Sequence, residues 1–410
     1  MLHLMVIEHN YYESCIDFGQ QFTGPAVRKL TLSNFRNYNK LTIKPECGIV
    51  VLTGDNGAGK TNLLEALSMF SPGRGFRRAR VADLDNNKLT DPTINPNALN
   101  GMNNSWAVSA KIEVNGDQVL IGTGRESTPG KGKIEKRALK INGYPVKSQT
   151  DLNEYITVSW LIPQMDRLFL DGGGQRRRFF DRLVFVFDAL HSTRVNQYNH
   201  ALRERRKLLY SFKRDSSWCL ALEAQIAETG VAIVAARRDL IRRLSPIVEQ
   251  RVDPFPSAIL SVDGIVERWL DNGPALAVED KLKEGLEQAR LNNNTEPNDV
   301  PGPHRSEFNC LHSEKNTPAD QCSTGEQKSL LISIMLAHAM LRKQEFGNAP
   351  LMLLDEVAAH LDELRRAGLF DLLGALESQV WMTGTDMSLF QTLGPRADFY
   401  NISDGNISLI

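Results

Sequence analysis

The hydrophobic positions of the chain follow two different periods. In the N-terminal part the period is two, because Arg28-Lys29-Leu30-Thr31-Leu32 alternates polar and apolar residues and Leu41-Thr42-Ile43 continues the pattern; this predicts half-exposed strands. From about Arg176, apolar residues recur three and four positions apart, as on the buried face of helices. We expect these helical stripes to form core: Phe180, Leu183, Phe187 and Leu190, then Leu222, Ile226, Ile233, Leu240 and Leu244.

Two Asn-Gly pairs predict an antiparallel meander between these regions. Asn115-Gly116 separates the apolar runs Trp106–Val114 and Val119–Ile121, and Asn142-Gly143 follows Ala138–Ile141. Asn-Gly between alternating runs favours a tight hairpin turn. We expect this meander to be attached to the sheet that carries the next motif.

The stretch Gly54-Asp55-Asn56-Gly57-Ala58-Gly59-Lys60-Thr61 fits G-x-x-x-x-G-K-[ST], the phosphate-binding P-loop. The apolar run Gly48–Leu52 before it predicts a buried strand, and Asn62–Phe70 after it predicts a helix. Glycines let several backbone N–H groups point into one concavity, and the helix N-terminus adds positive potential. Lys60 would serve the β- and γ-phosphates and Thr61 a Mg²⁺ ion. The alternative is a glycine-rich turn that matches by accident.

A second apolar run, Leu351–Leu354, ends in Asp355 and Glu356. A core strand that ends in acidic residues is common by itself. Downstream of a P-loop it predicts a Walker B strand, which delivers one carboxylate to Mg²⁺ and a second beside it.

Composition narrows the class of protein. The 410 residues carry a formal net charge of −1 and 41% hydrophobic residues, so any nucleic-acid surface must be a local patch. The five cysteines are scattered without metal-ligand spacing, which favours reduced thiols in a cytoplasmic protein. No apolar run has the length of a membrane span.

Basic residues gather in two places. The run Arg74-Gly75-Phe76-Arg77-Arg78-Ala79-Arg80 is either a solvated loop or a phosphate-contacting patch, and we take Arg74, Arg77, Arg78 and Arg80 as candidate DNA contacts. The outer faces of the predicted helices are expected to be solvated or to contact DNA; they hold Arg203, Arg205, Arg206, Lys207, Arg237, Arg238, Arg242 and Arg243.

The pattern predicts an α/β fold in four segments. We expect a flexible extension at 1–26, a P-loop ATPase domain with the meander at 27–175, an inserted helical domain at 176–295, and the second part of the ATPase domain at 296–410. The polar stretch Leu291–Pro303 marks the return to the first domain.

Three further motifs resemble those of ABC-type ATPases. Ser323-Thr324-Gly325-Glu326-Gln327 resembles the signature, Ala359-His360-Leu361-Asp362 the D-loop, and Gln164 stands where this class has its Q-loop. In that class the P-loop of one subunit and the signature of another close on one nucleotide. The resemblance therefore implies an ATP-dependent homodimer.

The distance between P-loop and signature narrows the class further. Transporter subunits have a much shorter stretch there, and SMC proteins have very long heptads. The chain from Val27 onward resembles the RecF family of bacterial recombination mediators. The motifs are Asn34-Phe35-Arg36-Asn37-Tyr38, Gly73-Arg74-Gly75-Phe76-Arg77, Arg176-Arg177-Arg178-Phe179-Phe180-Asp181 and Gly302-Pro303-His304-Arg305.

The resemblance implies roles for single residues. Thr61 and Asp355 would hold Mg²⁺, Gln164 would sense it, and Glu356 would polarise the attacking water. Ser323 and Gly325 would reach the γ-phosphate from the partner subunit. The implied ATP-binding set is Gly54, Asp55, Asn56, Gly57, Ala58, Gly59, Lys60, Thr61, Arg36, Ser323, Gly325 and Asp362.

The resemblance also implies a function. It is that of an ATP-switched DNA-binding protein with weak, DNA-stimulated ATPase activity, acting with RecR and RecO on gapped DNA, in replication restart and in the SOS response. Lys328 stands where arginine is commoner in the family, Ser306-Glu307 replaces two acids, and Thr383-Gly384-Thr385-Asp386 lacks a switch histidine, so we expect slow hydrolysis. A nucleotide-switched scaffold that never binds DNA and a transporter-type ATPase subunit remain alternatives.

Overall fold

A computed structural model describes residues 24–86, 105–126, 136–210, 216–291, 300–403 and 405–410. The expected extension at 1–26 lies almost entirely outside these residues. The first strand begins at Ala26, one residue before the predicted start of order.

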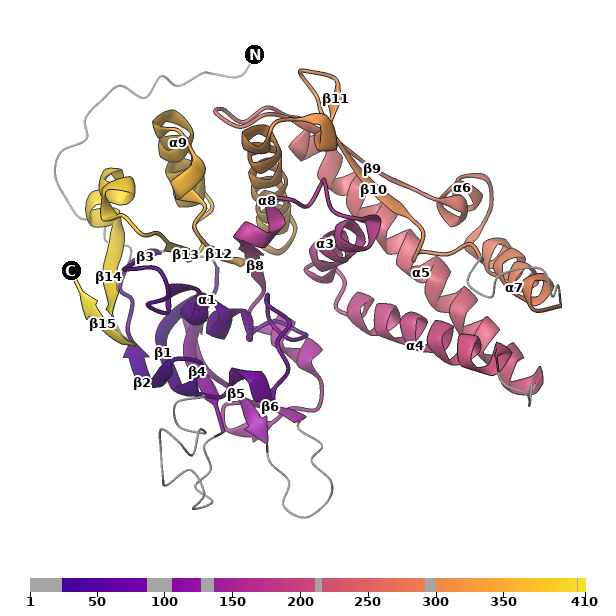
Figure 1. The fold of residues 1–410 in the computed structure, drawn as a ribbon, viewed down its shortest axis with the longest axis horizontal. Coiled ribbons are helices and arrows are strands. Elements are labelled where there is room, and N and C mark those ends of the chain that lie inside the picture. Colours follow the sequence, from indigo (N-terminus) through magenta and orange to yellow (C-terminus); the bar gives the residue numbers. More distant parts are fainter. Residues whose placement is uncertain (1–23, 87–104, 127–135, 211–215, 292–299, 404) are drawn as a thin grey trace.

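A largely parallel sheet forms the first layer, in the order β15-β14-β3-β13-β12-β8. All residues of the four central and edge strands β3, β13, β12 and β8 are buried, as the continuous apolar runs predict. Helix α1 lies on one side of this sheet, and α8 and α9 lie on the other (Figure 1). The bounds are β3 Ile49–Thr53, β8 Val158–Leu161, β12 Leu351–Leu354, β13 Val380–Thr383, β14 Ala397–Ser403, β15 Asn406–Leu409, α1 Lys60–Ser68, α8 Thr324–Phe346 and α9 Glu363–Ala375.

The predicted meander is part of a second, antiparallel sheet in the order β2-β1-β4-β5-β6-β7. Its bounds are β1 Ala26–Phe35, β2 Tyr38–Ile43, β4 Ala107–Val114, β5 Asp117–Glu126, β6 Lys136–Ile141 and β7 Tyr144–Pro145. Both Asn-Gly pairs turn with positive φ, at 52° and 86° for Asn115 and Gly116 and at 51° and 85° for Asn142 and Gly143. This matches the two-residue hairpin turn that the sequence predicts.

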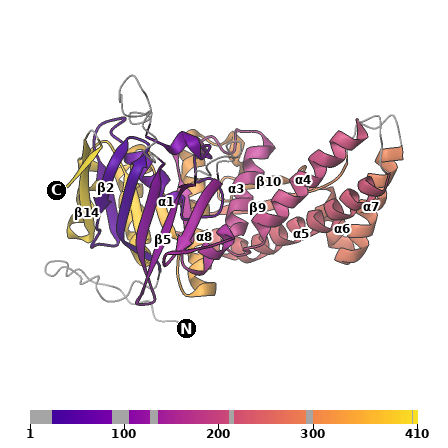
Figure 2. The same ribbon diagram turned by 90° about the horizontal axis from the view of Figure 1, so that it is seen from below.

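Beyond β8 the chain becomes mainly helical. The elements are α3 Gly173–Phe185, α4 His191–Leu209, α5 Ser216–Val248, α6 Ile265–Asn272 and α7 Ala275–Leu291. Helices α4, α5 and α7 extend away from the two sheets as an elongated arm (Figures 1 and 2). Short 3-10 turns elsewhere span Ala82–Leu84, Gln149–Glu154, Pro163–Met165, Ala319–Gln321, Ala358–His360 and Met387–Arg396.

A three-stranded sheet that the hydrophobic pattern did not predict ties the helical part to the rest. It has the order β11-β10-β9, with β9 at Ala258–Asp263, β10 at Glu307–His312 and β11 at Thr317–Pro318. Strand β9 pairs with β10 across the segment predicted to be a linker, with Val262 opposite Phe308. The helical part is therefore joined to the second half of the chain by backbone hydrogen bonds.

Two expectations about the helices are wrong. Arg205 and Arg237, expected on solvated outer faces, are 1% and 4% exposed, because each is paired with a buried carboxylate, Glu223 at 2.9 Å and Asp181 at 2.8 Å. Leu190 is 57% exposed, because α3 ends at Phe185 and the apolar stripe does not cross the break. The remaining stripe on α5 is buried as expected.

Among the described residues, α5 is the one helix whose length and composition would allow it to cross a membrane. More than half of its most apolar window, 56%, is buried inside the protein. The buried Arg237 also lies on this helix, paired with Asp181. Burial against other helices is the pattern of a core helix, so α5 is weak evidence for a membrane span.

Candidate nucleotide-binding site

The P-loop connects β3 to α1, as predicted. Gly54, Gly57 and Gly59 have φ values of 136°, 86° and 122°, which side chains rarely tolerate. A Cβ at Gly54 would lie 2.2 Å from the Ile402 carbonyl oxygen, whereas a Cβ at Gly57 would have no atom within 4 Å. Gly54 thus permits close packing against Ile402, whereas the space beside Gly57 is open.

Lys60 holds its ammonium group inside this loop. Its Nζ donates to the carbonyl oxygens of Gly54 at 2.5 Å and Asp55 at 3.0 Å. The side chain is only 5% exposed, and the nearest carboxylate is Glu356 Oε1 at 3.9 Å. The position of this charge is fixed by backbone contacts, which suits a cation that serves phosphate oxygens.

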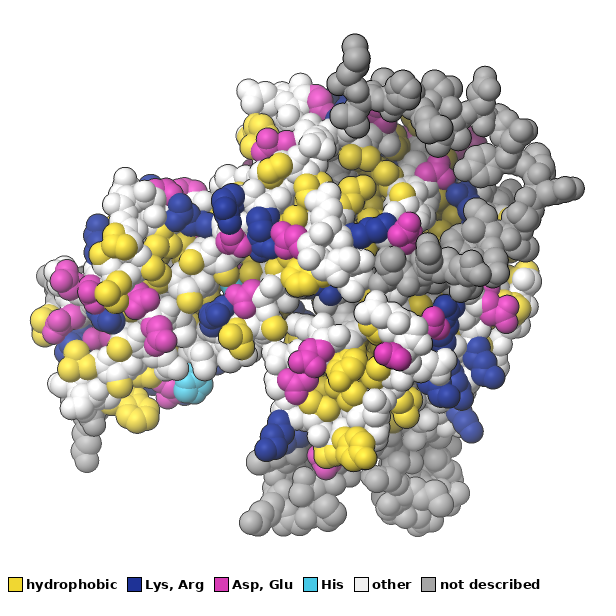
Figure 3. Space-filling view, turned by 180° about the vertical axis from the view of Figure 1, so that it is seen from behind, with side chains coloured by type: hydrophobic (Ala, Val, Ile, Leu, Met, Phe, Trp, Pro, Cys, Tyr) yellow, Lys and Arg dark blue, Asp and Glu magenta, His cyan; other side chains and the backbone are white. Residues whose placement is uncertain are grey.

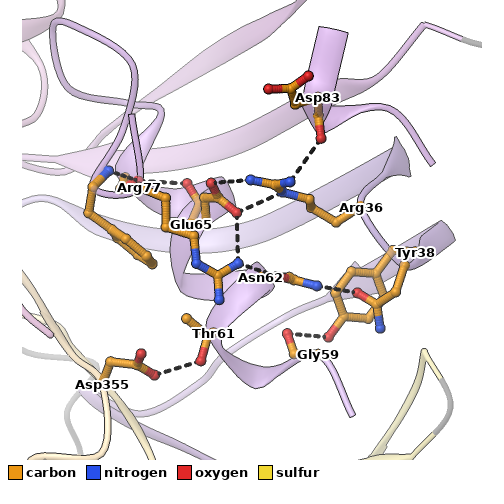
Figure 4. A network of polar contacts seen from close by, with 12 residues as sticks. Arg36, Tyr38, Gly59, Thr61, Asn62, Glu65, Arg77, Asp83 and Asp355 are labelled. Atoms are coloured by element: carbon orange, nitrogen blue, oxygen red, sulfur yellow. Dashed lines mark hydrogen bonds and ion pairs between the residues drawn. The ribbon is translucent and has the colours of Figure 1, made fainter. Parts of the chain in front are cut away.

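The Asp355 carboxylate lies at the end of β12, opposite the first turn of α1. Its Oδ1 accepts a hydrogen bond from Thr61 Oγ1 at 3.0 Å (Figure 4). The same atom accepts a second bond from Thr383 Oγ1 at 2.8 Å. Thr383 Oγ1 in turn accepts from the backbone N–H of Glu356 at 2.9 Å. The sequence predicted that Thr61 and Asp355 act at one site, but it did not predict that Thr383 orients them. The position of Thr383 at the end of the neighbouring strand β13 could have indicated this role.

Glu356 follows Asp355 in a left-handed conformation, with φ of 53°. Its side chain is a quarter exposed. Burial raises the pKa of its carboxyl above the usual range, against the attraction of Lys60. A carboxylate with a raised pKa at a polar edge is suited to accept a proton.

Two residues of the β1–β2 turn support the P-loop from behind. Asn37 Nδ2 donates to the carbonyl oxygen of Ala58 at 2.9 Å. Tyr38 Oη donates to that of Gly59 at 3.0 Å (Figure 4). Asn62 on α1 completes the contact by donating to Asn37 Oδ1 at 2.8 Å. The family motif contains these residues, but the sequence did not predict that they orient the loop.

Arg36 and Arg77, which the sequence assigned to ATP and DNA, meet on one buried carboxylate. Arg36 donates to both oxygens of Glu65, from Nε at 2.9 Å and from Nη2 at 2.8 Å. Arg77 Nη1 donates to Glu65 Oε2 at 3.2 Å and to Asn62 Oδ1 at 2.6 Å (Figure 4). Glu65 is completely buried. Both arginines are therefore held by Glu65, although their side chains are 22% and 34% exposed, and their contacts with ATP or DNA stay predictions.

The signature and D-loop residues form helix caps. Ser323 caps α8: its Oγ accepts from the backbone N–H of Glu326, whose side chain returns a bond to the Ser323 N–H at 2.9 Å. Asp362 caps α9 and accepts from the Arg365 N–H at 2.8 Å. A Cβ at Gly325 would meet no atom within 4 Å, so the start of α8 is open to a partner.

The structure brings some predicted site residues together and leaves others apart. Gln164, which is exposed, follows β8, and the backbone N–H of Asp355 donates to the Leu161 carbonyl oxygen at 2.8 Å. Gln164 therefore belongs to the same sheet edge as Asp355. Among the described residues, no hydrogen bond or ion pair joins Ser323 or Gly325 to the P-loop of the same chain.

Basic and acidic side chains are interspersed over much of the surface. On the face drawn in Figure 3, Lys and Arg side chains are scattered among Asp and Glu side chains. Arg74, Arg78 and Arg80 of the basic run are exposed. A DNA surface would therefore have to be local, as the net charge of −1 indicates.

The parallel sheet with its P-loop, the antiparallel sheet beside it and the inserted helices define an ABC-type ATPase fold. A family model described as the RecF/RecN/SMC N terminal domain matches residues 26–394. The chain is 44% identical to the DNA replication and repair protein RecF of Mesorhizobium japonicum, over 93% of this chain and 97% of that protein. It is 42% identical to RecF of Agrobacterium fabrum, over 93% and 98%. The chain belongs to the RecF family.

Solved structures agree with this fold. The structure of the recombination mediator protein RecF with ATP in the RecFOR pathway matches with a TM-score of 0.75 and 21% identity, over 94% of this chain and 99% of that one. An Smc head domain from Pyrococcus furiosus matches with a TM-score of 0.50 and 16% identity, over 94% and 96%. At these identities the matches concern the fold alone.

Proposed function

We propose that this protein is an ATP-dependent, DNA-binding recombination mediator of the RecF type. The observation that carries the proposal is the joining of the P-loop to the Walker B strand: Thr61 donates to Asp355, and Lys60 lies 3.9 Å from Glu356. Family membership supports the biological role, which is recombinational gap repair, replication restart and SOS induction in the cytoplasm.

The residues at this edge fit ATP with Mg²⁺. The open side of Gly57, the buried ammonium of Lys60 and the start of α1 suit the phosphate groups. Thr61 supplies a hydroxyl, and Asp355 and Gln164 supply oxygens of the kind that Mg²⁺ prefers. When bound, Mg²⁺ would neutralise part of the phosphate charge.

Glu356 is the residue that we assign to water activation. Its raised pKa favours proton acceptance, and Thr383 fixes its backbone at 2.9 Å. Thr385 and Asp386 occupy the region where many ABC ATPases carry a switch histidine. The proposal is therefore weak hydrolysis that resets a switch, stimulated by DNA.

The nucleotide would also control association. Ser323 and Gly325 lie at the start of α8 and make no hydrogen bond or ion pair with their own P-loop among the described residues. In a head-to-tail homodimer they would reach the γ-phosphate held by the partner, and Asp362 would lie at the same interface. RecO and RecR are proposed partners, since the matched solved structures place their own RecF in a RecFOR pathway.

The function is tested by measuring ATP turnover with and without gapped DNA. We expect stimulation by DNA, loss of ATP binding in Lys60→Ala, and retained ATP binding without turnover in Glu356→Gln. If the protein does not bind DNA and gapped DNA leaves the rate of ATP turnover unchanged, the scaffold alternative is favoured. Co-purification with a membrane protein would favour a transporter subunit.

Association is tested by light scattering with ATP, with ADP and without nucleotide. We expect a dimer with ATP only, because ADP lacks the γ-phosphate that both subunits would share. Ser323→Arg should bind ATP as a monomer, since its own P-loop is unchanged. A variant that dimerises normally with ATP would contradict the role of Ser323 across the interface.

A further inference from the structure

Three arginines from two distant parts of the chain gather where α3 meets the P-loop side of the molecule. Arg178 and Arg182 are four residues apart on α3 and lie on one face of that helix. Arg78 belongs to the loop after α1, where its φ of 55° places it in the left-handed region. We call Arg78, Arg178 and Arg182 the arginine cluster.

Packed aromatic rings connect the loop with the helix. The guanidinium of Arg182 lies over the ring of Trp160 at 4.6 Å and over that of Phe179 at 5.4 Å. The ring centroids of Trp160 and Phe76 are 6.4 Å apart, with the two rings tilted by 56°. Phe76 is two residues before Arg78, so the same contacts fix the loop against α3. The cluster is built by packed rings and by the face of a helix.

No carboxylate balances the charge of the cluster among the described residues. Arg182 donates only to the sulfur of Met165, at 3.5 Å, and Arg178 only to Gln175 Oε1, at 3.3 Å. Arg78 makes no side-chain hydrogen bond with a described residue. Two buried arginines of the helical part contrast with this, because Arg205 and Arg237 each pair with a buried acid.

The charge of Arg78 interacts with those of Arg178 and Arg182. Burial, and after it the charge of Arg178, lowers the pKa of Arg78. Burial, and after it the charge of Arg78, lowers the pKa of Arg182 to about 9. Like charges held close together in a partly desolvated place are costly unless an anion joins them. The geometry therefore favours an anion from outside the chain.

We infer that the arginine cluster binds phosphate groups of the DNA backbone. Arg78 and Arg178 are exposed and would make the outer contacts, and the half-buried Arg182 would supply charge from behind. Guanidinium groups bind phosphate oxygens in pairs, which suits this arrangement. Arg74 and Arg80 are exposed on the same loop and extend the positive surface.

The cluster would read the backbone and not the bases. The rings behind it, Trp160 and Phe179, are 6% and 3% exposed, so they are not available for stacking on bases. Contacts with phosphate carry no sequence information. This inference rests on the proposed DNA-binding function. It also revises the set of DNA contacts: Arg77 is removed, because it is held by Glu65, and Arg178 and Arg182 are added.

The test compares the parent with the double variant Arg78→Gln, Arg178→Gln. Affinity for a gapped duplex is measured by fluorescence anisotropy over a range of salt concentrations, with thermal melting to check the fold. We expect the affinity to fall about tenfold near 0.1 M salt, and the log–log salt slope to decrease by about 1 to 2, because two phosphate contacts are lost. Arg182→Lys should lose less affinity, since it keeps the charge.

Arg251→Gln is the matched control. The Arg251 side chain is 62% exposed and pairs with Asp253 at 2.7 Å, and its loss should leave the affinity and the salt slope unchanged. If the double variant binds DNA with the parental affinity and salt slope, the inference is overturned. This holds even if the variant has lost binding to an acidic polypeptide such as polyglutamate, because the cluster would then bind anions other than DNA. A parent that binds no DNA would instead overturn the proposed function together with the inference.

Discussion

Arg77 and Arg78 are neighbours in the sequence, yet their charges are handled in opposite ways. Arg77 turns inward and shares the buried Glu65 with Arg36. Arg78 joins Arg178 and Arg182, where no carboxylate of the described residues is in reach. The comparison teaches that a basic run has no single role, because the balance of charge is decided residue by residue by what the fold places opposite each guanidinium.

The balanced group belongs to the architecture of the P-loop. Glu65 lies on α1, and Arg36 lies in the turn beside Asn37 and Tyr38, which hold the loop carbonyls. An arginine pair on a buried carboxylate joins the second sheet, α1 and the following loop. The unbalanced cluster makes no such connection through charge, so the loss of its charge should affect ligand binding more than folding.

The largest expected effect is that of Glu65→Ala. It leaves two partly exposed guanidinium groups without their buried carboxylate, which we expect to cost about 3 kcal/mol of the free energy of unfolding, at the lower end for a broken buried pair. We expect ATP affinity to fall as well, because α1 carries Lys60 and Thr61. Chemical denaturation measures the first effect and nucleotide titration the second.

Glu65→Gln is the control for that variant, because it keeps the size and one acceptor and removes only the charge. It should lie between the parent and Glu65→Ala in stability. Equal stability of parent and Glu65→Ala would mean that the paired arginines are not part of the architecture, and the comparison with the arginine cluster would lose its basis.

Arg77→Gln should have a smaller effect on stability, of about 1 kcal/mol. The Arg77 side chain is 34% exposed, and Arg36 continues to balance Glu65. DNA affinity and its salt slope should stay parental. If Arg77→Gln weakened DNA binding as much as Arg78→Gln, the division between the two neighbours would be wrong.

The sequence predicted the parts of the site that depend on local pattern. The P-loop and the strand that ends at Asp355 each have their signal within a few consecutive residues. The hairpins did too, because Asn-Gly fixes the turn. These features need little information from distant parts of the chain, so the ABC-type fold could be predicted and is confirmed.

Features that depend on distant residues could not be predicted. Arg36 and Glu65 are 29 positions apart, and Thr383 reaches Asp355 across 28 positions from another strand. Helical periodicity predicted that Arg205 and Arg237 are exposed, because it contains no information about a carboxylate on another helix. The arginine cluster joins positions 78 and 178, which no local pattern relates.

Arg182→Met should change stability little, or raise it by about 1 kcal/mol. The replacement keeps apolar contact with Trp160 and Phe179 and removes a charge that has no carboxylate partner among the described residues. DNA affinity should nevertheless fall. This opposite response of stability and binding separates the cluster from the Glu65 group, where both should fall together. Denaturation and anisotropy on the same sample decide the point, and a loss of several kcal/mol would assign Arg182 to the core instead.

Glu356 is an acidic residue that can be compared with the arginine cluster. Its charge should have a small effect on how the stability of the protein depends on pH. Burial raises its pKa in the folded state, so the folded protein takes up this proton at a higher pH than the unfolded chain does. Its favourable contribution is therefore complete below the unfolded pKa of about 4.3 and is lost as the pH rises through the folded pKa.

Glu356→Gln, which is neutral at every pH, should consequently melt above the parent at pH 7 to 8, by about 1 °C. The difference should shrink as the pH is lowered toward 4.5, because the parental carboxyl then becomes protonated in the folded state. Melting curves of both proteins without nucleotide, recorded across this range, give the result. A difference that stays constant with pH would show that the charge of Glu356 is balanced within the protein, as that of Glu65 is, and would remove the physical basis for its assignment as the base.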